Sequence, residues 1–309
     1  MRPGCHRVCA CAVGYALANT ATCVVDPCYG KTCSGHGSCD PYFDPGACVC
    51  DFNYHGADCS EGRGPSPLFP GTRLIVAEWG EVLNGWTNST VATDEWMMCY
   101  SSLTDDATTP AAFHSQCDPY NATVSVMHNA GGEHNGKTNP GNYTFGGFGA
   151  GSWSVEACCA DPRNDCQSTY CFDQTSSQDF LFGLWMPGRA GGAGPQRYLP
   201  TGANTYYQGI DPDYWPNWGG RAGIGGDLII CNNNTTPGGT GGQCSQGGTY
   251  AGSPNEICGG EYNWGETQLE VWRPACTSCS GHGACDPSTR VCACAAGYAL
   301  AHPATCVPV

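Results

Sequence analysis

Cysteine is the residue type with the clearest chemistry in this sequence, because thiolates bind metal ions and thiols pair as disulfides. The chain has 25 cysteines among 309 residues, and many fall into two runs of six with similar spacing. The runs are Cys28, Cys33, Cys39, Cys48, Cys50 and Cys59, then Cys276, Cys279, Cys285, Cys292, Cys294 and Cys306. Zinc is one interpretation, since the cysteines at 276–279 and 292–294 lie near His282 and imitate a finger. Recurrence of the whole spacing favours disulfides.

The two runs belong to an internal repeat. Both contain Ser-Gly-His-Gly, at 34–37 and 280–283. The segment 8–18 is in addition nearly identical to 291–301. The chain therefore opens with the back half of a third such unit. We expect it to be a fragment of a longer chain that repeats this pattern, with the partner of Cys9 upstream.

The six-cysteine spacing resembles that of EGF-like modules, which places a partial module at 1–25 and complete modules at 26–60 and 276–309. That family pairs its first and third, second and fourth, and fifth and sixth cysteines. The resemblance implies the disulfides Cys28–Cys39, Cys33–Cys48, Cys50–Cys59, Cys276–Cys285, Cys279–Cys292, Cys294–Cys306 and, in the partial module, Cys11–Cys23. So short a module buries too little apolar surface to offset its chain entropy, and each crosslink contributes about 2–4 kcal/mol instead.

Several residues match signals for attached sugars. Asn-x-Ser/Thr triplets, which accept N-glycans on the surface of secreted proteins, occur at Asn88, Asn121, Asn142, Asn233 and Asn234. The last two overlap, so we expect a single glycan there. Ser38 resembles the O-fucose site of EGF-like modules. Trp215 begins a Trp-x-x-Trp pattern, which is a signal for C-mannosylation. Two other interpretations are a sugar-stacking platform and buried packing. Buried packing is the favoured interpretation.

Catalytic side chains form no recognisable set in this sequence. We find no nucleophile elbow, no paired histidine ligands and no catalytic Cys/His signature. His114, His128 and His134 stand apart, and His114 is predicted to order the fold by hydrogen bonding. The sequence therefore predicts no enzyme, no catalytic or metal-binding residue and no cofactor.

Composition narrows the class of protein. The net charge of −15 argues against nucleic acid, because its binders need clustered basic residues to release counterions. No run of about 18 apolar residues occurs, so we expect no membrane span. Dense cysteine indicates an oxidising, extracellular setting. The 45 glycines and 22 prolines, with only 13% charged residues, predict many turns and a mostly β chain.

The segment 61–275 is the one able to build a sizeable core. Its apolar runs predict strands at 74–76, 123–127, 180–185 and 227–230. A short helix is predicted at 109–115, with Thr109 as N-cap and Pro110 at the first helical position, where its missing N–H costs nothing.

Motifs in this segment resemble the TLDc family in order and spacing. They include Cys99-Tyr100, Phe113-His114, Phe145-Gly146-Gly147-Phe148, the run 180–184, the run 225–230 and Leu269-Glu270-Val271-Trp272-Arg273-Pro274. The resemblance implies a two-layer β-sandwich with short helices. Intracellular members are linked to oxidation resistance and to the vacuolar proton ATPase. Because this chain is rich in cysteine and sequons, we transfer neither role to it. The segments 157–178 and 231–262 are a further difference from the family and look like inserted surface loops.

Nine cysteines fall in the central segment, so one of them cannot pair within it. Cys99 and Cys117 flank the predicted helix and are the favoured pair. Cys231 with Cys244 or Cys258 is a further possibility. The odd cysteine is either a buried free thiol or bridges outward, to Cys5, Cys9 or a neighbouring chain.

Three classes of function remain, in descending order of preference. The first is a structural repeat unit of an extracellular glycoprotein filament or matrix, with copies of itself or modules of the same chain as partners. The second is a cell-surface adhesion or carbohydrate-binding module, and the third is a secreted enzyme. EGF-rich repeats of this kind resemble proteins of protist flagellar hairs, the mastigonemes.

Overall fold

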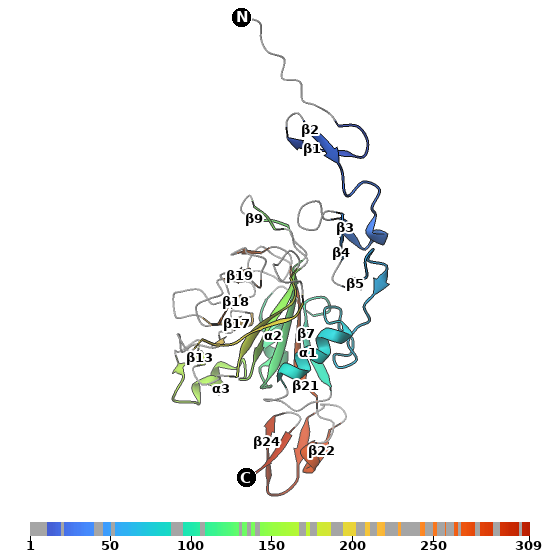
Figure 1. The fold of residues 1–309 in the computed structure, drawn as a ribbon. Coiled ribbons are helices and arrows are strands. Elements are labelled where there is room, and N and C mark those ends of the chain that lie inside the picture. The colour runs from blue at the N-terminus through green and yellow to red at the C-terminus, as the bar shows by residue number, and fades with distance from the viewer. Residues whose placement is uncertain are drawn as a thin grey trace, which may run out of the picture. The chain divides into compact units, whose positions relative to one another are not determined.

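A computed structural model shows a mostly β chain, as the composition predicts (Figure 1). It divides into two compact units, residues 1–63 and 64–309. The described residues are 11–19, 22–39, 46–50, 53–87, 95–105, 109–129, 132–134, 137–139, 143–166, 171–173, 178–186, 194–201, 208–210, 215–219, 228–229, 242–244, 250–251, 257, 263–264, 267–275, 279–286, 291–302 and 305–309.

The unit 1–63 consists of small antiparallel pairs of strands. Their bounds are β1 (Tyr15–Asn19) with β2 (Thr22–Val25), β3 (Gly37–Cys39) with β4 (Cys48–Cys50), and β5 (Tyr54–His55) with β6 (Glu61–Gly62). A single 3-10 turn, η1 (Cys33–Gly35), precedes β3. Strands of two to five residues bury little surface by themselves, so covalent links must hold this unit together.

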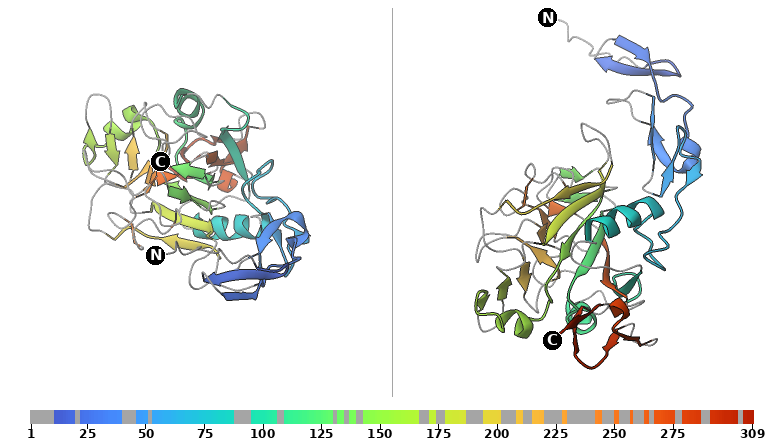
Figure 2. Two further views of the ribbon diagram at one scale, coloured as in Figure 1. Left: turned by 90° about the horizontal axis from the view of Figure 1, so that it is seen from above. Right: turned by 60° about the horizontal axis from the view of Figure 1, so that its bottom comes forward.

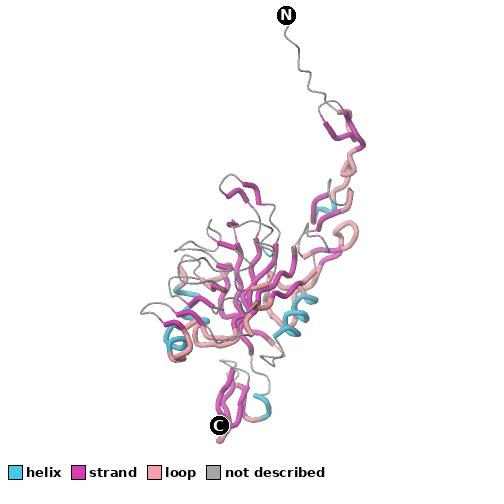
Figure 3. The backbone as a smooth tube through the Cα atoms, turned by 60° about the vertical axis from the view of Figure 1, so that its left-hand side comes forward, coloured by secondary structure: helices cyan, strands magenta, loops and turns pink. Residues whose placement is uncertain are grey.

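A six-stranded antiparallel sheet forms the centre of the unit 64–309 (Figures 1 and 3). Its order is β15 (Gln196–Tyr198), β14 (Phe180–Trp185), β11 (Tyr143–Gly149), β8 (Thr123–Asn129), β21 (Thr267–Pro274) and β7 (Trp96–Ser101). Every residue of β8 and β11 is buried, so both faces of the sheet are covered. The strands predicted at 123–127 and 180–185 are confirmed as β8 and β14.

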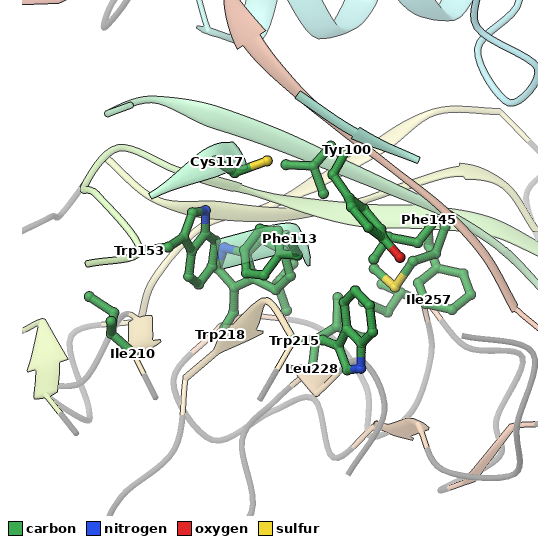
Figure 4. Close-up of a cluster of buried hydrophobic side chains, with 14 of the residues drawn as sticks. Tyr100, Phe113, Cys117, Phe145, Trp153, Ile210, Trp215, Trp218, Leu228 and Ile257 are labelled. Atoms are coloured by element: carbon green, nitrogen blue, oxygen red, sulfur yellow. The ribbon is translucent and has the colours of Figure 1, made fainter. Parts of the chain in front are cut away.

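A second sheet faces the first across an apolar core. Its order is β12 (Asp165–Cys166), β13 (Cys171–Asp173), β16 (Gln208–Ile210), β17 (Asn217–Trp218), β18 (Leu228–Ile229), β19 (Gly242–Cys244) and β20 (Asn263–Trp264). A separate hairpin joins β9 (Gly132–His134) and β10 (Lys137–Asn139). Tyr100 and Phe145 from the first sheet and Trp218 and Leu228 from the second share one core cluster, shown in Figure 4.

The opposite face of the six-stranded sheet is covered by α1 (Ala77–Thr87) and the loop before it (Figure 2). The prediction of a strand at 74–76 is wrong: these residues lead directly into α1. The buried side chains Trp79 and Leu83 lie four residues apart, which is helical spacing. Trp79 stacks on Trp185, with ring centroids 6.4 Å apart. The sheet is therefore enclosed on two sides, whereas a simple two-layer sandwich leaves outer faces open.

Two further short helices complete the unit. They are α2 (Ala111–Cys117) and α3 (Val155–Cys159). The N-cap prediction for α2 is wrong by one residue: Pro110, not Thr109, occupies that position, without a side-chain cap. Pro110 already has φ of −63° and ψ of −16°, and its carbonyl accepts a hydrogen bond from the His114 N–H at 3.0 Å. Proline's fixed φ therefore starts the helical geometry before the first assigned residue.

The C-terminal segment repeats the pattern of the N-terminal unit. It contains η3 (Cys279–Gly281), β22 (Gly283–Cys285) with β23 (Cys292–Cys294), and β24 (Tyr298–His302) with β25 (Thr305–Pro308). The β24–β25 pair has a register irregularity between Leu300 and His302, and β1–β2 has one between Leu17 and Asn19. These positions correspond in the aligned sequences, so the sequence repeat is also a structural repeat.

Candidate functional site

Disulfides hold the small modules together in the structure. Wherever both cysteines are described, the S–S bonds join the pairs that the EGF-like resemblance implies: Cys11–Cys23, Cys28–Cys39, Cys33–Cys48, Cys50–Cys59, Cys279–Cys292 and Cys294–Cys306. For the pair Cys276–Cys285, Cys276 and the side chain of Cys285 lie outside the described residues. Within the described residues, the buried core of each complete module consists of half-cystines.

Among the described residues, three disulfides crosslink the part of the second unit that precedes the C-terminal module, residues 64–275, which we call the central unit. Cys99–Cys117 joins β7 to α2. Two more, Cys158–Cys171 and Cys159–Cys166, tie α3 to β13 and β12. The adjacent cysteines of α3 thus clamp the insertion that the sequence singled out at 157–178. Cys231, Cys258 and the side chain of Cys244 lie outside the described residues, as do Cys5 and Cys9. The nine disulfides of the described chain fit an oxidising compartment.

A histidine and a tyrosine stack in the same way in both complete modules. The rings of His36 and Tyr54 lie 3.7 Å apart at 6°, and those of His282 and Tyr298 lie 4.1 Å apart at 12°. Each histidine comes from the Ser-Gly-His-Gly motif, and each tyrosine follows the fifth cysteine by four residues. Sequence reasoning identified the motif but missed this role, although the repeated tyrosine was a signal for it.

The sequon at 121–123 is the one whose residues the structure describes in full. Asn121 is exposed and lies two residues before the start of β8. Ala122 has a φ of +62°, and its N–H donates to the Ala150 carbonyl at 3.1 Å. Thr123 is fully buried, and its Oγ1 accepts a hydrogen bond from the Trp153 indole N–H at 2.7 Å. The left-handed turn at Ala122 therefore separates an outward asparagine from an inward threonine.

A pocket of about 220 Å³ opens beside Asn121. Its lining comes from the turn after β11, from α3, from the turn that follows α3 and from Ile210 at the end of β16. Ile210 is buried against the core cluster (Figure 4). Asp161 contributes charge: hydrogen bonds from the Arg163 guanidinium and backbone N–H lower the pKa of its carboxyl to about 2. A carboxylate, amides and apolar groups thus meet in one small cavity.

Of the other predicted N-glycan and O-fucose sites, only Ser38 lies within the described residues. Ser38 is exposed in β3. Asn88, Asn142, Asn233 and Asn234 lie outside the described residues.

Trp215 packs in the core rather than facing solvent. Its side chain is 1% exposed, and its ring lies 5.2 Å from that of Tyr100 and 6.2 Å from that of Phe113 (Figure 4). A ring enclosed in this way offers no face for sugar stacking in the folded chain. Trp215 therefore supports the packing interpretation of its motif.

His114 and Asp118 form a pair on one face of α2. His114 Nδ1 lies 2.8 Å from Asp118 Oδ1. The Asp118 carbonyl accepts a hydrogen bond from Ser152 Oγ at 2.6 Å. The chain His114–Asp118–Ser152 thus ties α2 to the turn after β11. This geometry suits a structural link, because the serine hydroxyl donates to a backbone carbonyl and not to the histidine.

Replacing His114 by alanine should lower the free energy of unfolding by about 1–2 kcal/mol, because a largely buried hydrogen bond is lost. Urea unfolding followed by tryptophan fluorescence measures this, since all nine tryptophans lie between Trp79 and Trp272. Asp118→Asn, which keeps an acceptor oxygen, should cost less. A hydrolytic turnover that disappears with His114→Ala would contradict the structural interpretation.

His128 is buried in β8 and lies 3.1 Å from the Thr144 hydroxyl. Burial lowers the pKa of its imidazole to about 4, from an ordinary value of 6.5. Between pH 6.5 and 4, the His128 imidazole is therefore protonated in the unfolded chain and neutral in the folded chain. Stability from this residue is complete above pH 6.5 and is lost as the pH falls toward 4.

When the pH is lowered from 7 to 5, the titration of His128 should reduce the free energy of unfolding by about 2 kcal/mol. His128→Gln removes the titration and keeps a partner for Thr144, so its unfolding free energy should fall less over that range. Urea titrations at both pH values compare the two proteins. His55→Gln, at a site with 44% side-chain exposure in the other unit, serves as the control. Identical pH dependence in His128→Gln and the parent would contradict the prediction.

The described residues hold no cluster of three or more His, Cys, Asp or Glu side chains arranged for a metal ion. Among the described helices, none is long and apolar enough to cross a bilayer. Comparisons with protein-family models and with curated proteins found no match to this chain. The EGF-like and TLDc-like resemblances consequently remain interpretations of the residues themselves.

Proposed function

We propose that this chain is a structural unit of an extracellular glycoprotein filament or matrix, in which EGF-like modules flank a TLDc-like domain. The observation that carries the proposal is the repeat at both ends of the central unit. Residues 26–60 and 276–309 share the Ser-Gly-His-Gly motif, the second-to-fourth and fifth-to-sixth disulfides, and the His–Tyr stack. Extended arrays are built from repeated units of this kind.

The physical advantage of this construction is resistance to unfolding outside the cell. Crosslinked modules keep their shape with very little apolar core, because disulfides restrict the unfolded chain. A module at one end can contact the central unit of the next copy, and a head-to-tail contact that does not close on itself yields a filament. A stable contact of this kind buries above roughly 1,000 Å². Flagellar hairs are one assembly of this type, and their proteins have EGF-rich repeats that this sequence resembles.

The test is to secrete the full chain from a eukaryotic host and measure its mass in solution over a range of concentrations. Light scattering should show concentration-dependent polymers, and negative-stain microscopy should show linear arrays. His282→Ala, which removes the ring stacked on Tyr298, should weaken association if the C-terminal module is the contact. A monomer at all concentrations would overturn the filament proposal and move the adhesion function to first place.

Glycosylation at Asn121 should precede folding. Transfer requires the asparagine amide and the threonine hydroxyl of one triplet to be presented together. In the folded chain the Thr123 hydroxyl is buried against Trp153. Folded protein from a non-glycosylating host, incubated with oligosaccharyltransferase and its lipid-linked donor, should therefore remain unmodified at Asn121. A peptide spanning 115–129 should accept the glycan under the same conditions.

Reduced and denatured protein supplies the matched control for that experiment. After the Cys99–Cys117 disulfide is opened and the chain unfolded, Asn121 should become a substrate, as in the free peptide. Equal transfer to folded and unfolded chains would show that the buried threonine does not limit modification.

A further inference from the structure

We propose that the pocket beside Asn121 holds the first N-acetylhexosamine of a glycan carried by that residue, an inference that rests on the proposed glycoprotein function. The pocket and the sequon have one residue in common, because Asn121 is among the residues that line the pocket. A sugar bonded to its Nδ2 begins at the pocket wall. The residue that would carry the sugar therefore borders the cavity itself.

The size of the pocket suits a single sugar. Its volume of about 220 Å³ lies below the ~300–1,000 Å³ that enclose drug-sized ligands. One pyranose ring with its acetamide group fits this scale, and the rest of a branched glycan does not. The second and later sugars would leave the pocket for solvent.

The lining matches the chemistry of an N-acetylhexosamine. Such a sugar has hydroxyl and amide N–H donors and an apolar methyl group. Asp161 provides an ionised acceptor for the donors, since Arg163 holds it in the carboxylate form. Ile210 and the buried Cys158 disulfide provide apolar surface for the methyl group. A few polar contacts combined with apolar surface in one small cavity orient a ligand of this kind.

The walls are fixed before any sugar arrives. Asn164 Nδ2 donates to the Cys158 carbonyl at 3.0 Å, and Ser154 Oγ caps α3 by accepting from the Ala157 N–H at 3.3 Å. Two disulfides clamp α3 to the neighbouring strands. A pocket with ordered walls binds a tethered group without paying for reorganisation. The glycan would in turn cover a turn that the protein otherwise leaves open to solvent.

Hydrogen exchange on three forms of the secreted protein tests this arrangement. The forms are the fully glycosylated chain, the chain trimmed by an endoglycosidase that leaves one N-acetylglucosamine, and the Asn121→Gln variant. Amides of 157–164 should exchange equally slowly in the first two. They should exchange about fivefold faster in Asn121→Gln, the factor that corresponds to ~1 kcal/mol of lost contact.

Ala157→Leu provides the matched variant, because it fills the pocket at an exposed lining position and leaves the sequon intact. In its background, Asn121→Gln should no longer change the exchange of 157–164. Equal exchange with and without the glycan in the parent would overturn the pocket assignment and leave the glycoprotein proposal standing. If Asn121 carried no glycan while other sequons did, the pocket assignment would also be overturned and the glycoprotein proposal would also stand. Absence of hexosamine from every sequon would overturn the glycoprotein proposal itself.

Discussion

Replacing Glu270 by alanine is expected to lower the free energy of unfolding of the unit 64–309 by about 4 kcal/mol. Glu270 is 1% exposed in the middle of β21. Its carboxyl group accepts hydrogen bonds from Thr72 Oγ1 and the Arg73 N–H, both at 2.7 Å, and from the Trp272 indole N–H at 3.3 Å. Alanine leaves three donors without this acceptor and a cavity beside them.

The loss extends beyond the carboxyl group because Thr72 organises the loop that precedes α1. Its Oγ1 accepts the Leu74 N–H at 3.1 Å and the Ile75 N–H at 3.0 Å. Both residues are buried against the sheet. Glu270 thus fixes the segment that covers one face of the sheet. Urea unfolding by tryptophan fluorescence measures the effect, and Glu81→Ala on the exposed side of α1 should change stability by less than about 0.5 kcal/mol.

Glutamine at position 270 separates hydrogen bonding from charge. Burial raises the pKa of the Glu270 carboxyl, so the folded chain holds its proton more tightly than the unfolded chain does. The contribution of this titration to stability is therefore complete below the unfolded pKa and is lost as the pH rises through the folded pKa. The parent should gain stability relative to Glu270→Gln as the pH falls toward 4.5. A difference that is constant with pH would contradict this assignment.

The strands that sequence predicted best are those of the central sheet. Thr123–Asn129 and Phe180–Trp185 are β-branched and aromatic runs buried on both faces, so their preference and their environment agree. The run at 74–76 has the same composition and is not a strand. Leu74 and Ile75 donate their N–H groups to Thr72 Oγ1. Thr72 is held in turn by the buried carboxylate of Glu270, 198 positions away along the chain, and a local pattern contains no such information.

Helix α1 could have been found from spacing alone. Trp79 and Leu83 stand four apart and Thr87 follows at the next turn, all three buried. Aromatic residues and glycines in the segment obscured this signal, since both are weak helix formers.

The sequon at Asn121 shows what sequence could and could not say about the candidate site. The triplet was recognisable from three letters. The threonine is buried because Trp153 packs on it, and the asparagine borders a pocket because α3 lies nearby. Both contacts exist only in the folded chain. Pairing of Cys158 with Cys171 and Cys159 with Cys166 was equally out of reach, because adjacent cysteines on a helix have no preferred partner until strands are placed.

Alanine at Gly147 is expected to cost the unit 64–309 about 3 kcal/mol, because the two sheets meet at this residue. A Cβ at Gly147 would overlap the indole ring of Trp218 from the second sheet. Trp218 is fully buried and lies edge-on to Trp153, with centroids 5.3 Å apart, so it cannot move aside freely. Added volume must therefore push the sheets apart or force Trp218 from its rotamer.

The same substitution at Gly85 is the matched control. Gly85 lies in α1 and is exposed, and a Cβ there would meet no atom within 4 Å. Alanine in an open helical position should stabilise the chain by up to about 1 kcal/mol, since it restricts the unfolded chain and favours the helix. The Gly→Ala substitution should thus destabilise the unit 64–309 at position 147 and stabilise it at position 85. The urea concentration at the midpoint of unfolding measures both effects.

A double-mutant cycle identifies the ring as the cause. Trp218→Leu shortens the side chain above Gly147 and by itself should be destabilising, because it leaves a cavity in the core. Combined with Gly147→Ala, it should cost less than the sum of the two single changes, because the added methyl group occupies space that the smaller side chain vacates. Strict additivity would mean that the clash at Gly147 lies elsewhere, and that Trp218 does not set the separation of the sheets.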